Sequence, residues 1–298
     1  MFHARNLSDD TDVERLKDFL MAARPHGQSA YMHVGDLLWG MRMHTQMNPQ
    51  RDHRIWFDES GSVAGFARLY PPADVLMQVR PSLRGSGVLE DEMLAWAVAE
   101  RARHGSADAP TPPITTAAAE SDTDTLSWLR SQRFTPNGDD LAILTRPLVD
   151  PVETAPLADG AVARAVSGVE EYPERVSIHR EVWAPSRVTL EGYALTRGAP
   201  GYEPELDLAV ALPGGAFAAY CVCWLDPLNR VGEFEPVGTR PAYRRKGYGR
   251  AILLEGMRRL RERGMREALV YCKAHNLDFY QAAGFQVVDQ YLGFSMTS

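Results

Sequence analysis

The chain has 298 residues, of which 45% are hydrophobic and 24% are charged, and its formal net charge at pH 7 is −7. The length predicts two domains of ordinary size, and the composition excludes a mostly disordered chain, a collagen-like repeat and a disulfide-rich miniprotein. Because phosphate groups repel an acidic protein, we expect neither non-specific nucleic-acid binding nor attachment to an anionic membrane.

Targeting and metal-binding patterns are not found in the sequence. The first ten residues are polar and acidic rather than apolar, and no run of 18 apolar residues predicts a membrane span. Three cysteines cannot form an even disulfide framework, which favours a reduced, cytoplasmic setting. The eight histidines are scattered without HExxH spacing, so we expect no metal site.

The first half of the sequence predicts two strands with a glycine-rich turn and a helix between them. Residues 63–70 and 141–145 are predicted to be strands. Between them, the segment VRPSLRGSG reads as a strand end, an Arg-Pro turn and a Gly-x-Gly loop, and an amphipathic helix follows it.

A proline-rich stretch divides the chain almost in half. Residues 147–159 carry three prolines among acidic and small residues, which predicts an extended linker between a domain of residues 1–146 and a domain of residues 160–298. The second half repeats the pattern of the first, with strands predicted over 216–224 and 286–294 and the segment TRPAYRRKGYG between them. We therefore predict two tandem α+β domains, each a mixed β-sheet flanked by helices.

A strand is predicted over residues 233–239, directly before the second basic turn. Pro236 cannot donate a backbone hydrogen bond, so it should mark a bulge or an edge where backbone groups are free to pair with a ligand. Glu233 and Glu235 are two residues apart and so share one face of the strand. Either carboxylate could be a general base, or the two could be solvated strand residues or partners of nearby arginines.

The turn after this strand concentrates positive charge in an acidic protein. Residues 240–250 hold five cations and no acid: Arg240, Arg244, Arg245, Lys246 and Arg250. Glycines at the start of the following helix let a bulky anion approach the first-turn amides, which together with the helix dipole favour phosphate. The spacings of a Walker A loop and of a dinucleotide fingerprint are absent, so another polyphosphate ligand is predicted.

The spacing of Arg244, Gly247 and Gly249 resembles the coenzyme A pyrophosphate loop of the Gcn5-related N-acetyltransferase (GNAT) family. The segment FYQAAGF, residues 279–285, is similar to the family's aromatic-Tyr-x-x-x-Gly-Phe segment. The resemblance covers residues 160–294 and, more loosely, the first half, where Ser82 replaces the loop arginine. It implies two tandem GNAT-like domains, of which the first is degenerate and structural and the second binds acetyl-coenzyme A.

The resemblance also implies roles for individual residues. The backbone of Val237, Gly238 and Thr239 would pair with the pantetheine arm, an amide near Val237 would stabilise the oxyanion, and Tyr280 would protonate the departing thiolate. The family usually has an asparagine seven residues before this tyrosine, whereas Asn276 stands four before it and is the candidate for that cofactor contact. The turn residues implied in pyrophosphate binding are Arg244, Arg245, Lys246, Gly247, Tyr248, Gly249 and Arg250.

The expected activity is transfer of an acetyl group from acetyl-coenzyme A to the amine of a small molecule by direct attack, in a monomer or homodimer. Trp183, Tyr193 and Tyr202 could form an aromatic wall for the acceptor, or belong to the core. Two other functions fit the same motifs. One is a catalytically silent acyl-coenzyme A sensor or scaffold, and the other is a protein N-acetyltransferase whose first domain docks a polypeptide.

Overall fold

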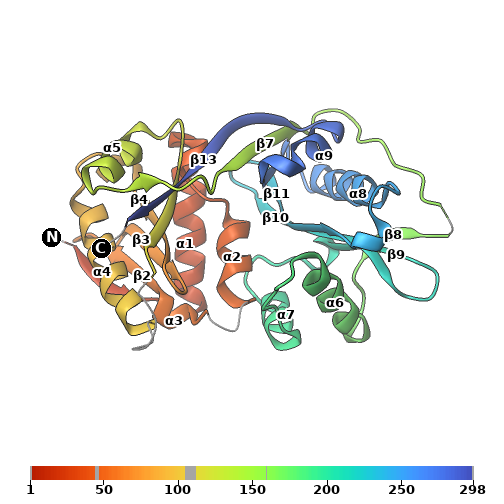
Figure 1. Cartoon of the computed structure of the whole chain (residues 1–298), viewed down its shortest axis with the longest axis horizontal. Coiled ribbons are helices and arrows are strands. Elements are labelled where there is room, and N and C mark those ends of the chain that lie inside the picture. The colour runs from red at the N-terminus through yellow and green to blue at the C-terminus, as the bar shows by residue number, and fades with distance from the viewer. Residues whose placement is uncertain (1, 44–46, 105–111, 159, 297–298) are drawn as a thin grey trace. The chain divides into compact units, whose positions relative to one another are not determined.

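The computed structural model describes residues 2–43, 47–104, 112–158 and 160–296, which form two compact units (Figure 1). The C-terminal unit comprises Leu144–Val287 together with residues 33–43, which contain helix α2 (Val34–Arg42), and the N-terminal unit holds the remaining described residues. One boundary therefore falls close to the predicted linker. Helix α2 comes from the first half of the sequence, and the chain beyond Val288 returns to the N-terminal unit.

The strands of the N-terminal unit follow the order β1-β2-β3-β4-β5-β13, where β13 (Gln286–Met296) also pairs with β6. The remaining bounds in this unit are β1 (His3–Asn6), α1 (Asp10–Ala23), α3 (Pro49–Asp52), β2 (His53–Phe57), β3 (Val63–Tyr70), β4 (Asp74–Val79), α4 (Val88–His104), β5 (Ile114–Ala119), α5 (Thr123–Ser131) and β6 (Thr135–Pro136). Neighbouring strands from β1 to β4 are antiparallel, and β4 and β5 are parallel.

The strands of the C-terminal unit follow the order β7-β12-β11-β10-β9-β8. Its elements after α2 are β7 (Leu141–Pro147), β8 (Val162–Ala165), α6 (Tyr172–Val182), α7 (Leu190–Arg197), β9 (Asp207–Ala211), β10 (Phe217–Asp226), β11 (Val231–Thr239), α8 (Tyr248–Glu262), β12 (Glu267–Cys272) and α9 (Leu277–Ala282). Strands β8 to β11 pair antiparallel, and β11 and β12 pair parallel. The predicted α+β class with mixed sheets flanked by helices is confirmed.

Helices cover both faces of the strands in the C-terminal unit, with α8 on one face and α6 and α7 on the other (Figure 1). On the α8 face, the side chains of Ile252, Met257 and Leu260 are fully buried, as the apolar stripe of the sequence predicts. Gly256 permits close packing here, because a Cβ at this position would overlap the ring of Phe234. Among the described residues, none of the helices combines the length and apolar character needed to cross a bilayer.

Candidate active site

Strands β11 and β12 separate part-way along their length. They pair at Val231, Gly232 and Glu233, and in the described chain the rest of β11 has no partner strand on that edge. On its other edge, the register with β10 shifts between Cys221 and Cys223 because β11 has one extra residue there. This bulge lies at Glu235 and Pro236, as predicted. The edge from Phe234 to Thr239 is therefore free to pair with an extended ligand.

The turn between β11 and α8 exposes a run of backbone amides. Within the described part of the chain, the N–H groups from Arg245 to Arg250 have no backbone acceptor. Arg245 and Gly247 both have positive φ, 63° and 85°, which turns this stretch of backbone before the helix begins. Successive unpaired amides at a helix N-terminus favour an anion such as pyrophosphate.

The first turn of α8 lies close to β11 and α9 because Gly249 has no side chain. A Cβ at Gly249 would stand 2.8 Å from Oγ1 of Thr239 and 3.1 Å from the ring of Phe279. Either contact would push the helix away from the strand. The second glycine of the predicted loop therefore holds the exposed amides beside the free edge of β11.

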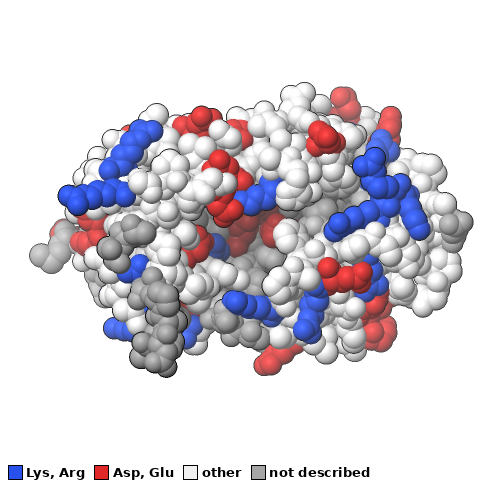
Figure 2. Space-filling view, viewed as in Figure 1, with Lys and Arg blue, Asp and Glu red and all other residues white. Residues whose placement is uncertain are grey.

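The cations of this loop do not all face solvent. Arg240 forms ion pairs with Glu174 at 2.7 Å and Glu181 at 2.9 Å, and so fastens the loop to α6. The side chains of Arg244, Arg245, Lys246 and Arg250 are exposed. Figure 2 shows Lys and Arg gathered around the start of α8. The charge available to a phosphate ligand therefore comes from these four residues.

The two glutamates of β11 have different environments. Glu233 is fully buried, and its Oε2 lies 2.9 Å from Nδ1 of His33, which caps α2. Glu235 is partly buried, and its carbonyl accepts a hydrogen bond from Nε1 of Trp224 at 2.6 Å. Burial, and then the charge of Asp36 on α2, raises the pKa of the Glu235 carboxyl to about 8. Glu235 is the stronger base candidate, because the Glu233 carboxyl is fully buried in the core beside His33.

Tyr280 lies on α9 and is 7% exposed. Its ring packs against Phe279 and Phe285 at centroid distances of 4.9 Å and 5.8 Å. Burial, followed by its ionisable neighbours Cys272 and Glu235, raises the pKa of the Tyr280 hydroxyl. The hydroxyl therefore keeps its proton at neutral pH and can donate it. Asn276 is exposed directly before α9, at the N-cap position.

Two of the three aromatic residues proposed for an acceptor wall serve a buried network. The hydroxyls of Tyr193 and Tyr202 donate to Oδ2 of Asp207 at 2.5 Å and 2.7 Å, and Nε of Arg175 donates to its Oδ1 at 2.9 Å. Such a network stabilises the unit only while every member is paired. Tyr193 and Tyr202 thus belong to the core, the alternative that the sequence left open.

Trp183 differs from these two tyrosines because it is 49% exposed. Its Nε1 donates to the buried hydroxyl of Tyr220 at 2.8 Å, and that hydroxyl also lies 2.8 Å from Nδ1 of His179. The ring of His179 is 5.5 Å from that of Trp39 on α2. Sequence reasoning did not place α2 here, because about 200 residues separate it from β11 and no local pattern links the two.

In the N-terminal unit, the space beside the corresponding turn is filled by the unit's own side chains. Arg84 is ion-paired with Asp122 and lies over the ring of Tyr31, and the Tyr31 hydroxyl donates to the carbonyl of Val79 at 2.8 Å. Glu90 stands in the first turn of α4, where a negative charge opposes phosphate binding. The space lined by these residues holds about 40 Å³, room for water but not for a cofactor.

Comparison with known proteins identifies relatives of both the sequence and the fold. Residues 172–285 match the model of the Acetyltransferase (GNAT) family. The mycothiol acetyltransferase of Nocardia farcinica is 27% identical over 80% of each chain, and that of Kineococcus radiotolerans is 30% identical over 67% of this chain and 66% of that protein. A tandem GNAT protein from the clavulanic acid biosynthesis pathway superposes with a TM-score of 0.70 at 16% identity, covering 99% of this chain and 98% of the other. The predicted tandem GNAT-like fold is confirmed.

Proposed function

Because the chain belongs to the GNAT acetyltransferase family, we propose that it transfers the acetyl group of acetyl-coenzyme A to the amine of a small molecule, at the site in its C-terminal unit. The observation that carries this proposal is the free edge of β11 ending at a turn of unpaired amides. An extended arm with a diphosphate at its end has the shape and charge to fill both. The names of the curated relatives, which refer to mycothiol, support a small-molecule acceptor.

The chemistry begins with removal of a proton from the acceptor ammonium. Glu235 is the proposed base, and a carboxyl with a pKa of about 8 can take this proton near neutral pH. The amine nitrogen then bonds to the thioester carbonyl carbon, and a backbone N–H of the bulged stretch near Val237 donates to the oxyanion. The loss of one such donor raises the barrier by about 3 kcal/mol.

Collapse of the tetrahedral intermediate breaks the carbon–sulfur bond, and the electron pair leaves with sulfur. Tyr280 is the proposed acid that protonates the thiolate, since its hydroxyl keeps its proton at neutral pH. The nitrogen of the intermediate carries a second extra proton, which it loses as the intermediate collapses. That proton restores the Tyr280 hydroxyl through solvent, and the proton that Glu235 accepted is released to solvent. The products are an N-acetylated acceptor and free coenzyme A, and no cysteine nucleophile takes part.

Release of coenzyme A thiol in the presence of a panel of small amines tests the proposal. We expect thiol release that depends on the amine and is lost in Gly247→Asp, because a carboxylate would stand beside the pyrophosphate. Gly214→Asp is the matched control: Gly214 also has a positive φ and open space around it, but it lies in the turn between β9 and β10. Binding of acetyl-coenzyme A without amine-dependent thiol release would instead indicate a silent sensor and overturn the proposal.

A further inference from the structure

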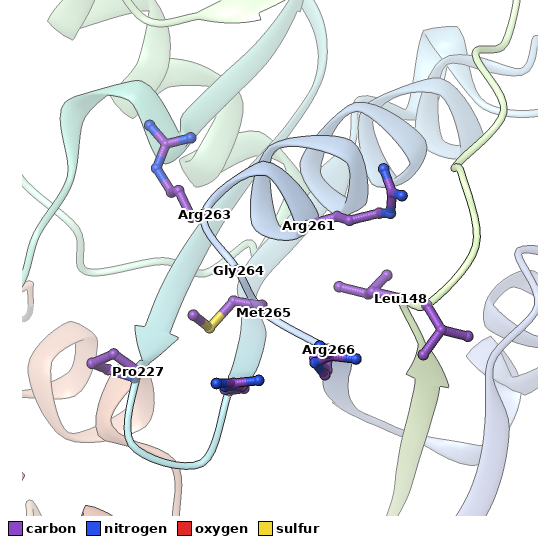
Figure 3. Close-up of a pocket in the computed structure, with 9 residues that line it drawn as sticks. Leu148, Pro227, Arg261, Arg263, Gly264, Met265 and Arg266 are labelled. Atoms are coloured by element: carbon purple, nitrogen blue, oxygen red, sulfur yellow. The ribbon is translucent and has the colours of Figure 1, made fainter.

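A second basic feature lies at the opposite ends of β11 and α8 from the cofactor loop. It is a hollow of about 610 Å³, which we call the arginine hollow. Three chain segments form it: the end of β7, the turn before β11, and the turn between α8 and β12 (Figure 3). Its lining residues are Leu148, Val149, Pro227, Arg230, Arg261, Arg263, Gly264, Met265 and Arg266.

Backbone hydrogen bonds fasten the three segments together. The carbonyl of Arg230 accepts from the N–H groups of Arg266 at 2.7 Å and Glu267 at 3.2 Å, and the N–H of Leu148 donates to the carbonyl of Arg266 at 2.8 Å. Arg230 has a φ of +57°, a conformation that L residues rarely adopt. The backbone that carries the arginines of the hollow is therefore held in place by hydrogen bonds between the three segments.

Of the four arginines that line the hollow, three have no acidic partner among the described residues. Arg263 is paired with Glu203 at 2.7 Å and projects away from Arg261 and Arg266 in Figure 3. Arg230, Arg261 and Arg266 are exposed, and no hydrogen bond or ion pair joins their side chains to the described residues. The other arginines of the last turns of α8 do have acidic partners, which are Glu205, Glu255 and Glu262.

The dipole of α8 does not explain the whole cluster. A cation in the last turn of a helix offsets the negative end of the dipole, which accounts for Arg261. Arg230 and Arg266 belong to no helix, so that stabilisation does not apply to them. Three like charges around one hollow repel one another unless an anion lies between them, and this protein carries a net charge of −7.

The floor of the hollow is apolar. Leu148 and Met265 are buried, and Leu148 lies between Arg261 and Arg266 in Figure 3. A volume of about 610 Å³ falls within the usual range for small-molecule sites, and guanidinium forks bind phosphate oxygens in pairs. We infer that the arginine hollow binds a small molecule with several phosphate groups on an apolar or aromatic body.

Adenosine triphosphate and inorganic triphosphate are suitable probes for this site. Titration should use the full chain carrying Gly247→Asp, so that the cofactor loop contributes no phosphate binding and the outcome is independent of the proposed activity. We expect one saturable site for adenosine triphosphate that weakens as salt rises, since the interaction is between charges. Adenosine triphosphate should bind more tightly than inorganic triphosphate, because the apolar floor contacts its base.

The test variant is Arg261→Gln with Arg266→Gln, in the same background. It leaves Arg230 unchanged, because a substitution at positive φ would also alter the turn. We expect affinity to fall at least tenfold, while the thermal midpoint falls only slightly, because both side chains are exposed and Arg261 contributes only its interaction with the helix dipole. Arg130→Gln with Arg180→Gln removes the same charge from exposed positions elsewhere in the chain and should leave binding unchanged. No saturable binding at millimolar nucleotide, or equal affinity in the test variant, would overturn the inference.

Discussion

The base assignment makes a quantitative prediction about pH. Glu235 has a raised pKa of about 8 because it is buried and because Asp36 adds a negative charge nearby. A base must be unprotonated to act, so the active fraction is about one tenth at pH 7 and about nine tenths at pH 9. The kcat/KM should therefore rise roughly tenfold across this range, and Glu235→Gln should lower it by a factor of about 100 or more.

The acceptor amine also titrates, and the variant Asp36→Asn distinguishes its titration from that of Glu235. Removing the charge of Asp36 stabilises the ionised form of Glu235, so the inflection in kcat/KM should move to lower pH while the pKa of the acceptor is unchanged. Activity at pH 7 should then increase rather than decrease. Glu191→Gln, in the first turn of α7, is the control and should leave the inflection in place. An unchanged inflection in Asp36→Asn, or its persistence in Glu235→Gln, would refute the assignment.

Three further substitutions test other parts of the structure. Tyr280→Phe should lower kcat at least tenfold and leave the Kd of acetyl-coenzyme A unchanged; equal kcat would remove Tyr280 from the mechanism. Gly256→Val should lower the free energy of unfolding by about 1–3 kcal/mol in urea, because its side chain would overlap Phe234, and wild-type stability would contradict that packing. Asp207→Ala should cost about 3–5 kcal/mol because Arg175 would be buried without its partner; a loss under 1 kcal/mol would show that water replaces the carboxylate.

Features encoded by contiguous residues could be predicted from the sequence. Pro236 lacks an amide proton wherever it stands, and a bulge occurs at that position. Gly247 likewise meets a local requirement, since it has positive φ, whereas Gly249 is needed because Thr239 and Phe279 of other elements lie close to it. The apolar stripe of α8 also predicted which face of the helix is buried, because the helical period depends on the segment alone.

Features that depend on distant partners could not be predicted. Arg240 was grouped with the phosphate-binding cations, but Glu174 and Glu181 pair with it, and no spacing in the sequence links them. His33 caps α2 and lies beside the buried Glu233, so a helix from the first half distinguishes two glutamates that the strand pattern leaves equivalent.

The central claim is that the C-terminal loop alone binds the diphosphate of acetyl-coenzyme A, and calorimetric titration of the full chain tests it most directly. The account predicts one molecule bound per chain, binding abolished in Gly247→Asp, and one molecule still bound in Gly85→Asp, which alters the corresponding turn of the N-terminal unit. Undiminished affinity in Gly247→Asp, or a stoichiometry that falls from two to one in Gly85→Asp, would contradict it.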